Sequence, residues 1–239
     1  YKNLYRIIAS DNQIGSSMAV YAAKVLKVTK VGVIDDRTAF GQGLAEEFTK
    51  EAKKQGLTVV GQEFTTDKAV DFTAILTNMK AKAPEAIFFG GYAPQAAPMA
   101  RQMKQLAVPG KLLGGDTVCS PATGKLGGDA VNDLVFCAQG GSILEKAQSG
   151  PAFKEKFKKR FNVDPDAYAA SYYDQVLLIG ESMKKANSID PDKVGAELYK
   201  TTYKGVAATY SYDDKGNMKQ APITVFTFKN AAPVPLASY

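Results

Sequence analysis

The chain has 239 residues, of which 45% are hydrophobic, with a formal net charge of +6 and no histidine. The apolar share predicts a folded core and argues against wholesale disorder. The lack of histidine excludes a Ser-His-Asp triad and removes the commonest general base and zinc ligand. Two cysteines are too few for a tetrahedral cysteine site, so most hydrolase and metal chemistry is disfavoured.

The first half of the chain alternates short apolar runs with amphipathic segments. We expect strands at residues 4–8, 31–34, 57–64, 86–89 and 112–113, and helices at 16–26, 41–55, 71–82 and 94–106. The strand segments are nearly continuous apolar runs. Such strands are buried on both faces, which predicts a parallel, doubly wound α/β sheet.

The second half of the chain is mostly helical. Helices are expected at residues 151–160, 166–186 and 191–201, and strands at 208–212 and 223–228 are expected to form a hairpin around the turn at 213–217. The proline-rich tail at 231–239 has no clear pattern, and no apolar run reaches the length of about 18 residues that spans a membrane.

The helix at 166–186 has an unusually broad apolar stripe. Its members are Tyr168, Tyr172, Val176, Leu177, Ile179, Gly180 and Met183. One interpretation is that this helix packs on the first-half sheet, although that sheet already has four helices of its own. The favoured interpretation is that the stripe belongs to a second lobe. The strands of that lobe would come from a segment preceding residue 1, which this chain lacks.

Candidate ligand residues follow the expected strands. In an open parallel sheet, ligands bind beyond the carboxyl ends of the strands, where this chain has residues 10–11, 35–43, 90–92 and 114–117. Phe40 and Tyr92 can form apolar walls, and Asp116 can neutralise an ammonium group. Ordinary turn chemistry explains each residue taken singly, so the argument for a ligand site depends on their gathering at one edge.

Cofactor and nucleic-acid sites are not supported. Gly41-Gln42-Gly43 lacks the third glycine of a dinucleotide fingerprint, and neither a Walker sequence nor a Gly-x-Ser-x-Gly elbow occurs. No cofactor is therefore expected, and an enzyme of the doubly wound class is disfavoured. The basic run at 154–160 is interpreted as a solvated amphipathic helix rather than a nucleic-acid surface.

The oxidation state of Cys119 and Cys137 depends on the compartment. In a cytosolic protein they would be two buried thiols, and in an exported protein they would pair. The residues by themselves leave this alternative open.

A series of segments along the whole chain carries a family resemblance. It comprises Tyr5-Arg6-Ile7, Asp35-Asp36-Arg37-Thr38-Ala39-Phe40-Gly41-Gln42-Gly43-Leu44, Asp71-Phe72-Thr73, Phe89-Gly90-Gly91-Tyr92, Gly114-Gly115-Asp116, Tyr173-Asp174 and Tyr212-Asp213-Asp214-Lys215-Gly216-Asn217. In order and spacing this series resembles the leucine/isoleucine/valine-binding type of periplasmic substrate-binding protein. Proteins of that type serve ABC transporters and have the type I periplasmic-binding-protein fold.

The resemblance implies two α/β lobes that trap a ligand. Residues 1–138 and 206–239 would form the ligand-binding lobe, and 139–205 the helical part of the other. It also implies export to the periplasm by a signal peptide outside this chain, a Cys119–Cys137 disulfide, and a membrane permease as partner. The intact protein is expected to be a monomer, whereas this chain alone is expected either to self-associate or to need the missing segment.

Five ligand-site positions carry over from the resemblance. Phe40 would pack on the ligand at a position that is usually Tyr, Tyr92 would line the cleft, and Asp116 would bind the α-ammonium at a position that is often Glu. Tyr168 would contact the ligand's side chain from the other lobe, and Asp11 would lie near the hinge. The expected ligand is a branched-chain or other aliphatic amino acid. The alternative is a sensor or binding protein for an amide, urea or aromatic acid, because Phe40 and Asp116 depart from the usual residues.

Overall fold

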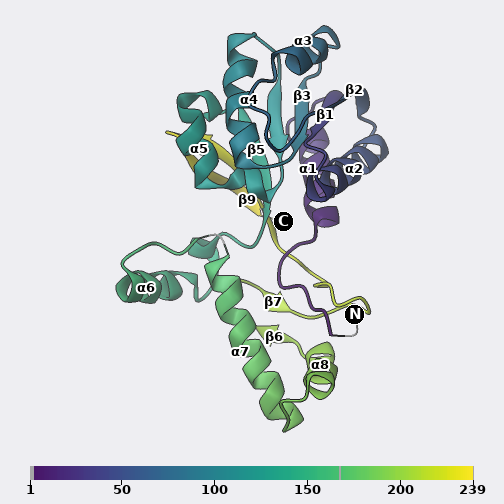
Figure 1. Ribbon diagram of the computed structural model, residues 1–239. Helices are drawn as coiled ribbons and strands as arrows, with labels where there is room; N and C mark the ends of the chain where they lie inside the picture. Colours follow the sequence, from purple (N-terminus) through teal and green to yellow (C-terminus); the bar gives the residue numbers. More distant parts are fainter. Residues whose placement is uncertain (1–2, 167, 239) are drawn as a thin grey trace. The chain divides into compact units, whose positions relative to one another are not determined.

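The computed structural model describes residues 3–166 and 168–238 (Figure 1). The chain divides into two compact units. The sheet unit consists of residues Asp11–Gln139 and Val225–Ala237. The described residues of the helical unit are 3–10, 140–166, 168–224 and 238. From the sequence, residues 1–10 and 206–224 were expected in the ligand-binding lobe. In the structure the described residues of both segments belong to the helical unit.

The sheet has seven strands in the order β2-β1-β3-β4-β5-β8-β9. Their bounds are β1 (Lys30–Asp35), β2 (Thr58–Phe64), β3 (Ala86–Gly90), β4 (Lys111–Gly114), β5 (Val135–Gly140), β8 (Ile223–Lys229) and β9 (Ala232–Ser238). β1 pairs in parallel with both β2 and β3, and the parallel pairing continues through β4 to β5. The predicted doubly wound α/β fold is therefore confirmed. The strand order reverses between β1 and β3, which is the topological switch point of such a sheet.

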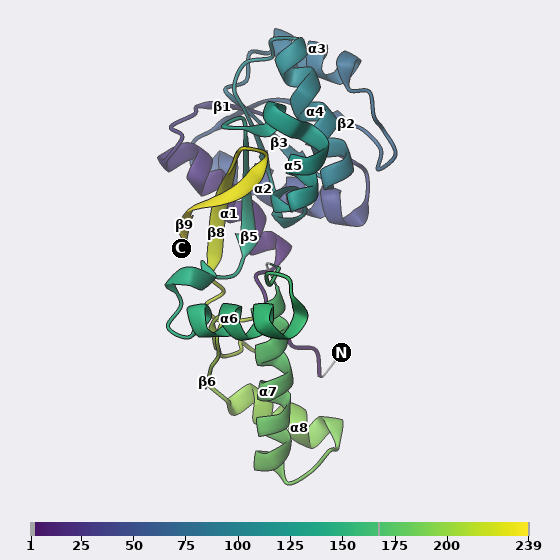
Figure 2. The same cartoon turned by 90° about the vertical axis from the view of Figure 1, so that its left-hand side faces the viewer.

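Helices cover both faces of this sheet (Figures 1 and 2). One face carries α1 (Asp11–Lys24) and α2 (Ala39–Lys54), and the other carries α3 (Thr73–Ala81), α4 (Ala93–Gln105) and α5 (Pro121–Gly127). Adjacent residues of β3 serve opposite faces, as the pleat requires. Phe88 stacks on Phe48 of α2 with ring centroids 4.1 Å apart, while Phe89 packs in the core with Leu76 and Met99.

Two short 3-10 helices complete the sheet unit: η1 (Asp116–Cys119) and η2 (Gly128–Val131). Cys119 at the end of η1 is bonded to Cys137 of β5, and both sulfur-bearing side chains are buried. The disulfide implied by the family resemblance is therefore present.

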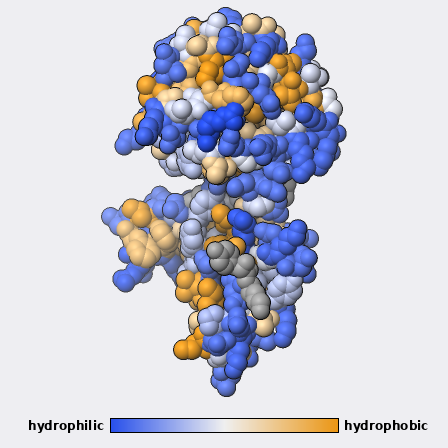
Figure 3. Space-filling view, turned by 45° about the vertical axis from the view of Figure 1, so that its right-hand side comes forward, coloured by the Kyte–Doolittle hydropathy of each residue, from blue (hydrophilic) through white to orange (hydrophobic). Residues whose placement is uncertain are grey.

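The helical unit contains η3 (Leu144–Lys146), α6 (Gly150–Phe161), α7 (Ala169–Ala186), α8 (Pro191–Lys200), and the short antiparallel pair β6 (Tyr203–Lys204) and β7 (Thr209–Tyr210). Its core is small: Leu178, Val194, Leu198, Tyr210, Tyr212 and Met218. The other side of α7 is open, with Tyr172 60%, Val176 70% and Leu177 44% exposed. Figure 3 shows apolar side chains on the surface of the lower part of the chain. The stripe on α7 is thus left partly open within the helical unit.

Two expectations about strands were wrong, and one strand was not expected. Residues 4–8 form no strand, because the segment bonds through single contacts, such as the Arg6 N–H donating to Gly216 O, rather than through a ladder. The segments at 208–212 and 223–228 form no hairpin, because β7 pairs with β6 whereas β8 joins the main sheet. The tail forms edge strand β9 after Asn230 and Ala231, whose positive φ angles of 50° and 57° are those a tight hairpin turn needs.

No helix within the described ranges is both long enough and apolar enough to cross a membrane.

Candidate functional site

The candidate site is built at the switch point of the sheet, where β1 and β3 end side by side. Each strand leads through a loop of a few residues into a helix, β1 into α2 and β3 into α4. Thr38 caps α2, and its side-chain oxygen accepts a hydrogen bond from the Gly41 N–H at 2.9 Å. Capping of this kind satisfies backbone donors that the first helical turn leaves without partners.

A buried carboxylate, Asp36, organises this point. Its backbone N–H donates to Gly90 O at 3.0 Å, and its Oδ1 accepts from the N–H and the hydroxyl of Thr38 at 3.0 and 2.6 Å. The side chain is 2% exposed, and Oδ2 has no hydrogen-bond partner within the described part of the chain. Asp36 was not among the predicted site residues. An aspartate two residues before a helix-capping threonine is the local signal that points to it.

Two glycines allow the close approach of α2 to β3. A Cβ added to Gly90 would collide with the carbonyl oxygen of Gly41, and a Cβ added to Gly41 would collide with Asp36 Oδ1 and with Gly90 O. The start of α2 therefore rests directly on the end of β3, which brings the residues after both strands together.

The structure places two of the predicted aromatic residues in contact. Phe40 in the first turn of α2 and Tyr92 at the start of α4 have ring centroids 5.2 Å apart with an interplanar angle of 42°. Tyr92 is 38% exposed and Phe40 is half-buried. The pair forms an accessible apolar wall at the carboxyl edge of the sheet.

Asp116 lies on the neighbouring loop, at the start of η1 after β4. Its Oδ1 accepts from the Thr117 N–H at 2.9 Å, and the Thr117 hydroxyl donates to Gly91 O at 2.6 Å. The loop that carries Asp116 is therefore bonded to the loop that carries Tyr92. Three predicted residues thus follow three neighbouring strands of one sheet.

Asp11 and Tyr168 are not part of this cluster of loops. Asp11 is the first residue of α1, which begins earlier than the sequence suggested, and it is exposed. Tyr168 belongs to the helical unit, where it stands at the start of α7 and its N–H donates to Asp166 Oδ1 at 3.1 Å.

The chemistry of the cluster is that of recognition. A half-buried carboxylate, on a loop bonded to one that carries an aromatic ring, is a combination suited to a cation with an apolar group. The described residues contain no group of three or more side chains suited to hold a metal ion.

Comparison with known proteins identifies the family. A sequence model of the periplasmic binding protein family matches residues 1–233. The chain belongs to this family. Membership agrees with the sheet order and with the resemblance drawn from the sequence, which is thereby confirmed.

Relatives within the periplasmic binding protein family share moderate identity with the chain. The leucine-, isoleucine-, valine-, threonine- and alanine-binding protein of Pseudomonas aeruginosa is 27% identical over 233 residues, which cover 97% of this chain and 62% of that protein. The chain therefore spans about three fifths of the length of that curated relative.

Solved structures of the family show the same fold. A leucine-binding protein, LivK, from Thermotoga maritima matches with a TM-score of 0.91 and 26% identity, covering 99% of this chain and 68% of that one. The protein LivJ from Streptococcus pneumoniae, solved in complex with isoleucine, matches with a TM-score of 0.80 at 22% identity, covering 95% and 66%. The second likeness concerns the fold alone.

Proposed function

We propose that the protein is the substrate-binding component of an ABC importer and that it takes a branched-chain or other aliphatic α-amino acid. The observation that carries the proposal is the grouping of Phe40, Tyr92 and Asp116 on three bonded or contacting loops at the switch point. The names of the leucine-binding relatives support this ligand class. The family and the disulfide support an extracytoplasmic location, because disulfides persist in oxidising compartments.

In this proposal Asp116 receives the ligand's α-ammonium. Its Oδ1 accepts one hydrogen bond from Thr117, and an ionised carboxylate has further lone pairs on both oxygens for an ammonium donor. The charge-assisted bond orients the amino acid, and the rings of Phe40 and Tyr92 pack against its aliphatic side chain. Tyr168 is a further proposed ligand contact, and Asp11 is a proposed hinge residue.

A thermal-shift screen of the intact protein tests the ligand class. The twenty amino acids are compared with amides, urea and aromatic acids. A ligand at a hundred times its dissociation constant adds about 2.7 kcal/mol of stability. We expect shifts with leucine, isoleucine or valine. Shifts only with uncharged or aromatic compounds would contradict the proposal and favour the alternative of a sensor or binding protein for such molecules.

Two variants with the same change in charge localise the binding. Asp116→Asn removes the proposed ammonium partner and should abolish the shift. Asp133→Asn is the matched control, because Asp133 lies just before β5, at the opposite edge of the sheet, and is exposed. Equal effects of the two substitutions would show that Asp116 has no specific role.

Delivery to a membrane permease is tested by uptake. Cells that lack the protein should lose import of the labelled amino acid, and re-expression of the protein should restore it. Unchanged uptake would contradict the transport role while leaving ligand binding intact.

A further inference from the structure

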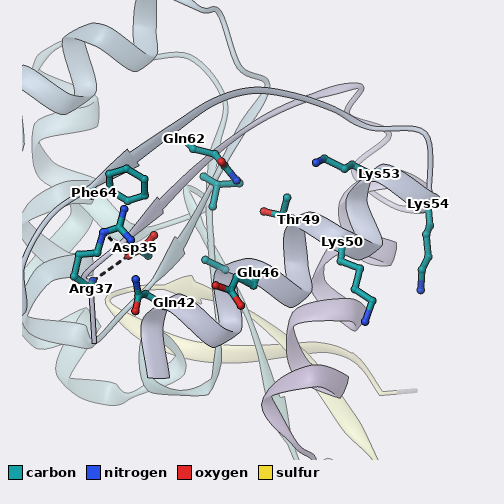
Figure 4. A pocket seen from close by; sticks show the side chains of 12 residues that line it. Asp35, Arg37, Gln42, Glu46, Thr49, Lys50, Lys53, Lys54, Gln62 and Phe64 are labelled. Atoms are coloured by element: carbon teal, nitrogen blue, oxygen red, sulfur yellow. Dashed lines mark hydrogen bonds and ion pairs between the residues drawn. The ribbon is translucent and has the colours of Figure 1, made fainter. Parts of the chain in front are cut away.

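A cavity lies between α2 and the outer part of the sheet. It has a volume of about 500 Å³ and is open to solvent (Figure 4). Within the described residues, β2 is the edge strand of the sheet on this side. The floor comes from β1 and β2, and the wall is one stripe of α2 that includes Gln42, Glu46, Thr49 and Lys53.

One end of the cavity has hydrogen-bond donors without partners. Thr49 is only 9% exposed, and its hydroxyl has no partner within the described chain. A buried hydroxyl in that state is costly and needs an explanation. In Figure 4 the Thr49 hydroxyl, the Lys53 side chain and the Gln62 amide extend toward the same space from α2 and β2.

Lys53 differs from the lysines beside it. Lys50 and Lys54 pair with Glu47 and Glu51 at 3.6 and 3.1 Å, whereas Lys53 makes no ion pair with any residue that the structure describes. Its positive charge is therefore available to a ligand.

The carboxyl-terminal end of α2, near Lys53, does not strongly repel an anion. The carbonyl oxygens of Glu51, Ala52 and Lys53 accept hydrogen bonds from the N–H groups of Gln55, Leu57 and Gly56. Because these last-turn carbonyls are satisfied, the negative end of the helix is largely neutralised.

The other end of the cavity is apolar. Val33 and Ala45 contribute to its lining, and Phe64 closes it with a ring that is 50% exposed. The Arg37 guanidinium carbon lies 3.2 Å from the centroid of the Phe64 ring. The Nε atom of Arg37 lies 3.7 Å from Asp35 Oδ1, with which it forms an ion pair. A guanidinium that stacks on a ring still presents its N–H donors in its own plane, at the opening of the cavity.

We propose that this cavity binds a small organic oxyanion. The carboxylate or phosphate head is held by Thr49, Lys53 and Gln62, and a short body lies along Val33 and Ala45 toward Phe64. The proposal does not depend on the amino-acid site, because none of these six residues belongs to that cluster.

Titration calorimetry of the intact protein with inorganic phosphate and with butyrate tests the proposal and distinguishes the two kinds of head group. We expect saturable binding of at least one of them. Lys53→Gln should weaken that binding about tenfold, because it removes a charge-assisted hydrogen bond. Lys24→Gln is the matched control: it makes the same charge change at the exposed last residue of α1, which does not line the cavity.

Thr49→Val separates ligand binding from folding. It removes a hydroxyl without a partner, so the thermal midpoint should stay unchanged or rise while oxyanion binding weakens. Absence of saturable binding to both compounds would overturn the proposal. Equal losses in Lys53→Gln and Lys24→Gln would also overturn it, because they would indicate diffuse attraction by surface charge. Leucine binding, measured in the same variants, should not change.

Discussion

The two units of the chain differ in how completely they bury the apolar residues of their helices. In the sheet unit, α4 buries Ala96, Met99 and Met103 in a core built on a covered sheet. In the helical unit, α7 buries Leu178 but leaves Tyr172 and Val176 exposed, and the unit's own strands, β6 and β7, have two residues each. A helix with apolar residues on both sides needs packing partners on both sides, and the described part of the helical unit leaves Tyr172 and Val176 of α7 uncovered.

This contrast indicates that the sheet unit contributes most of the folding stability. Apolar burial is the dominant favourable term in folding, and the largest fully buried side chains are concentrated in the sheet unit, with Tyr210 as the exception. Large exposed apolar surfaces favour association. Substitutions in the two units should therefore have unequal consequences.

The largest expected effect is the loss of a core aromatic in the sheet unit. Phe48 is fully buried and stacks on Phe88, so Phe48→Ala should cost about 3–5 kcal/mol of unfolding free energy. Phe161→Ala, in the helical unit and 59% exposed, should cost less than about 0.5 kcal/mol. Denaturant unfolding measures both. Similar losses would show that the two units are equally well packed.

Removal of the disulfide should have the next largest effect. The Cys119–Cys137 bond links residues 18 apart within the sheet unit. The chain-entropy account gives about 3 kcal/mol for a loop of this size. Replacing both cysteines with serine should lower the thermal midpoint, and a midpoint that stays the same would contradict the assignment of a stabilising bridge.

Alkaline pH should act on the helical unit. Burial, with a smaller contribution from Tyr5, raises the pKa of Tyr212 to about 12, and burial together with the charge of Asp174 raises the pKa of Tyr210. An unfolded tyrosine ionises near pH 10. The stabilising contribution of the neutral phenols is therefore complete below pH 10 and is lost as the pH rises toward 12.

Tyrosinate absorbance follows this transition directly, because the chain has no tryptophan. Tyr212→Phe should remove one late-titrating phenol and reduce the loss of stability above pH 10. If every tyrosine titrated near pH 10 in the folded protein, the burial of this cluster would be contradicted.

The smallest effect on folding is expected at the open side of α7. Val176→Ser should change the unfolding free energy by no more than about 0.5 kcal/mol, because Val176 is 70% exposed. Leu178→Ala, on the buried side of the same helix, should cost about 2–5 kcal/mol.

Self-association provides a second measurement on α7. Sedimentation velocity of the 239-residue chain should show oligomers that decrease in Val176→Ser. A compact monomer at all concentrations would contradict the expectation that this surface drives association.

Strands β1 to β4 of the sheet unit were predictable because their signals are local. The run at 31–34 is apolar and bounded by Lys30 and Asp35, and β1 covers it with one more residue at each end. The pairing of β8 was not predictable in this way. The turn at 213–217 does form, with Asp213 Oδ1 accepting from the N–H groups of Lys215 and Asn217. The strands on either side of it separate because their partners lie elsewhere in the chain.

The same distinction applies to the site. The rule that ligands meet the carboxyl edge of a parallel sheet predicted that Phe40 and Tyr92 would be neighbours, and their ring contact is observed. Their role in ligand binding stays a prediction. The cavity beside α2 could not be predicted, because it exists only where β2 is the edge strand, and strand order is not a local property.

The most direct test of amino-acid recognition compares leucine with 4-methylpentanoate, which has the same carbon skeleton and carboxylate but no ammonium. Calorimetric titration of the intact protein should show leucine binding at least about a hundredfold more tightly, since 4-methylpentanoate cannot form the charge-assisted hydrogen bond to Asp116. Asp116→Ala should abolish that preference. Equal affinity for the two compounds in the wild-type protein would contradict the assignment of Asp116 as the ammonium partner.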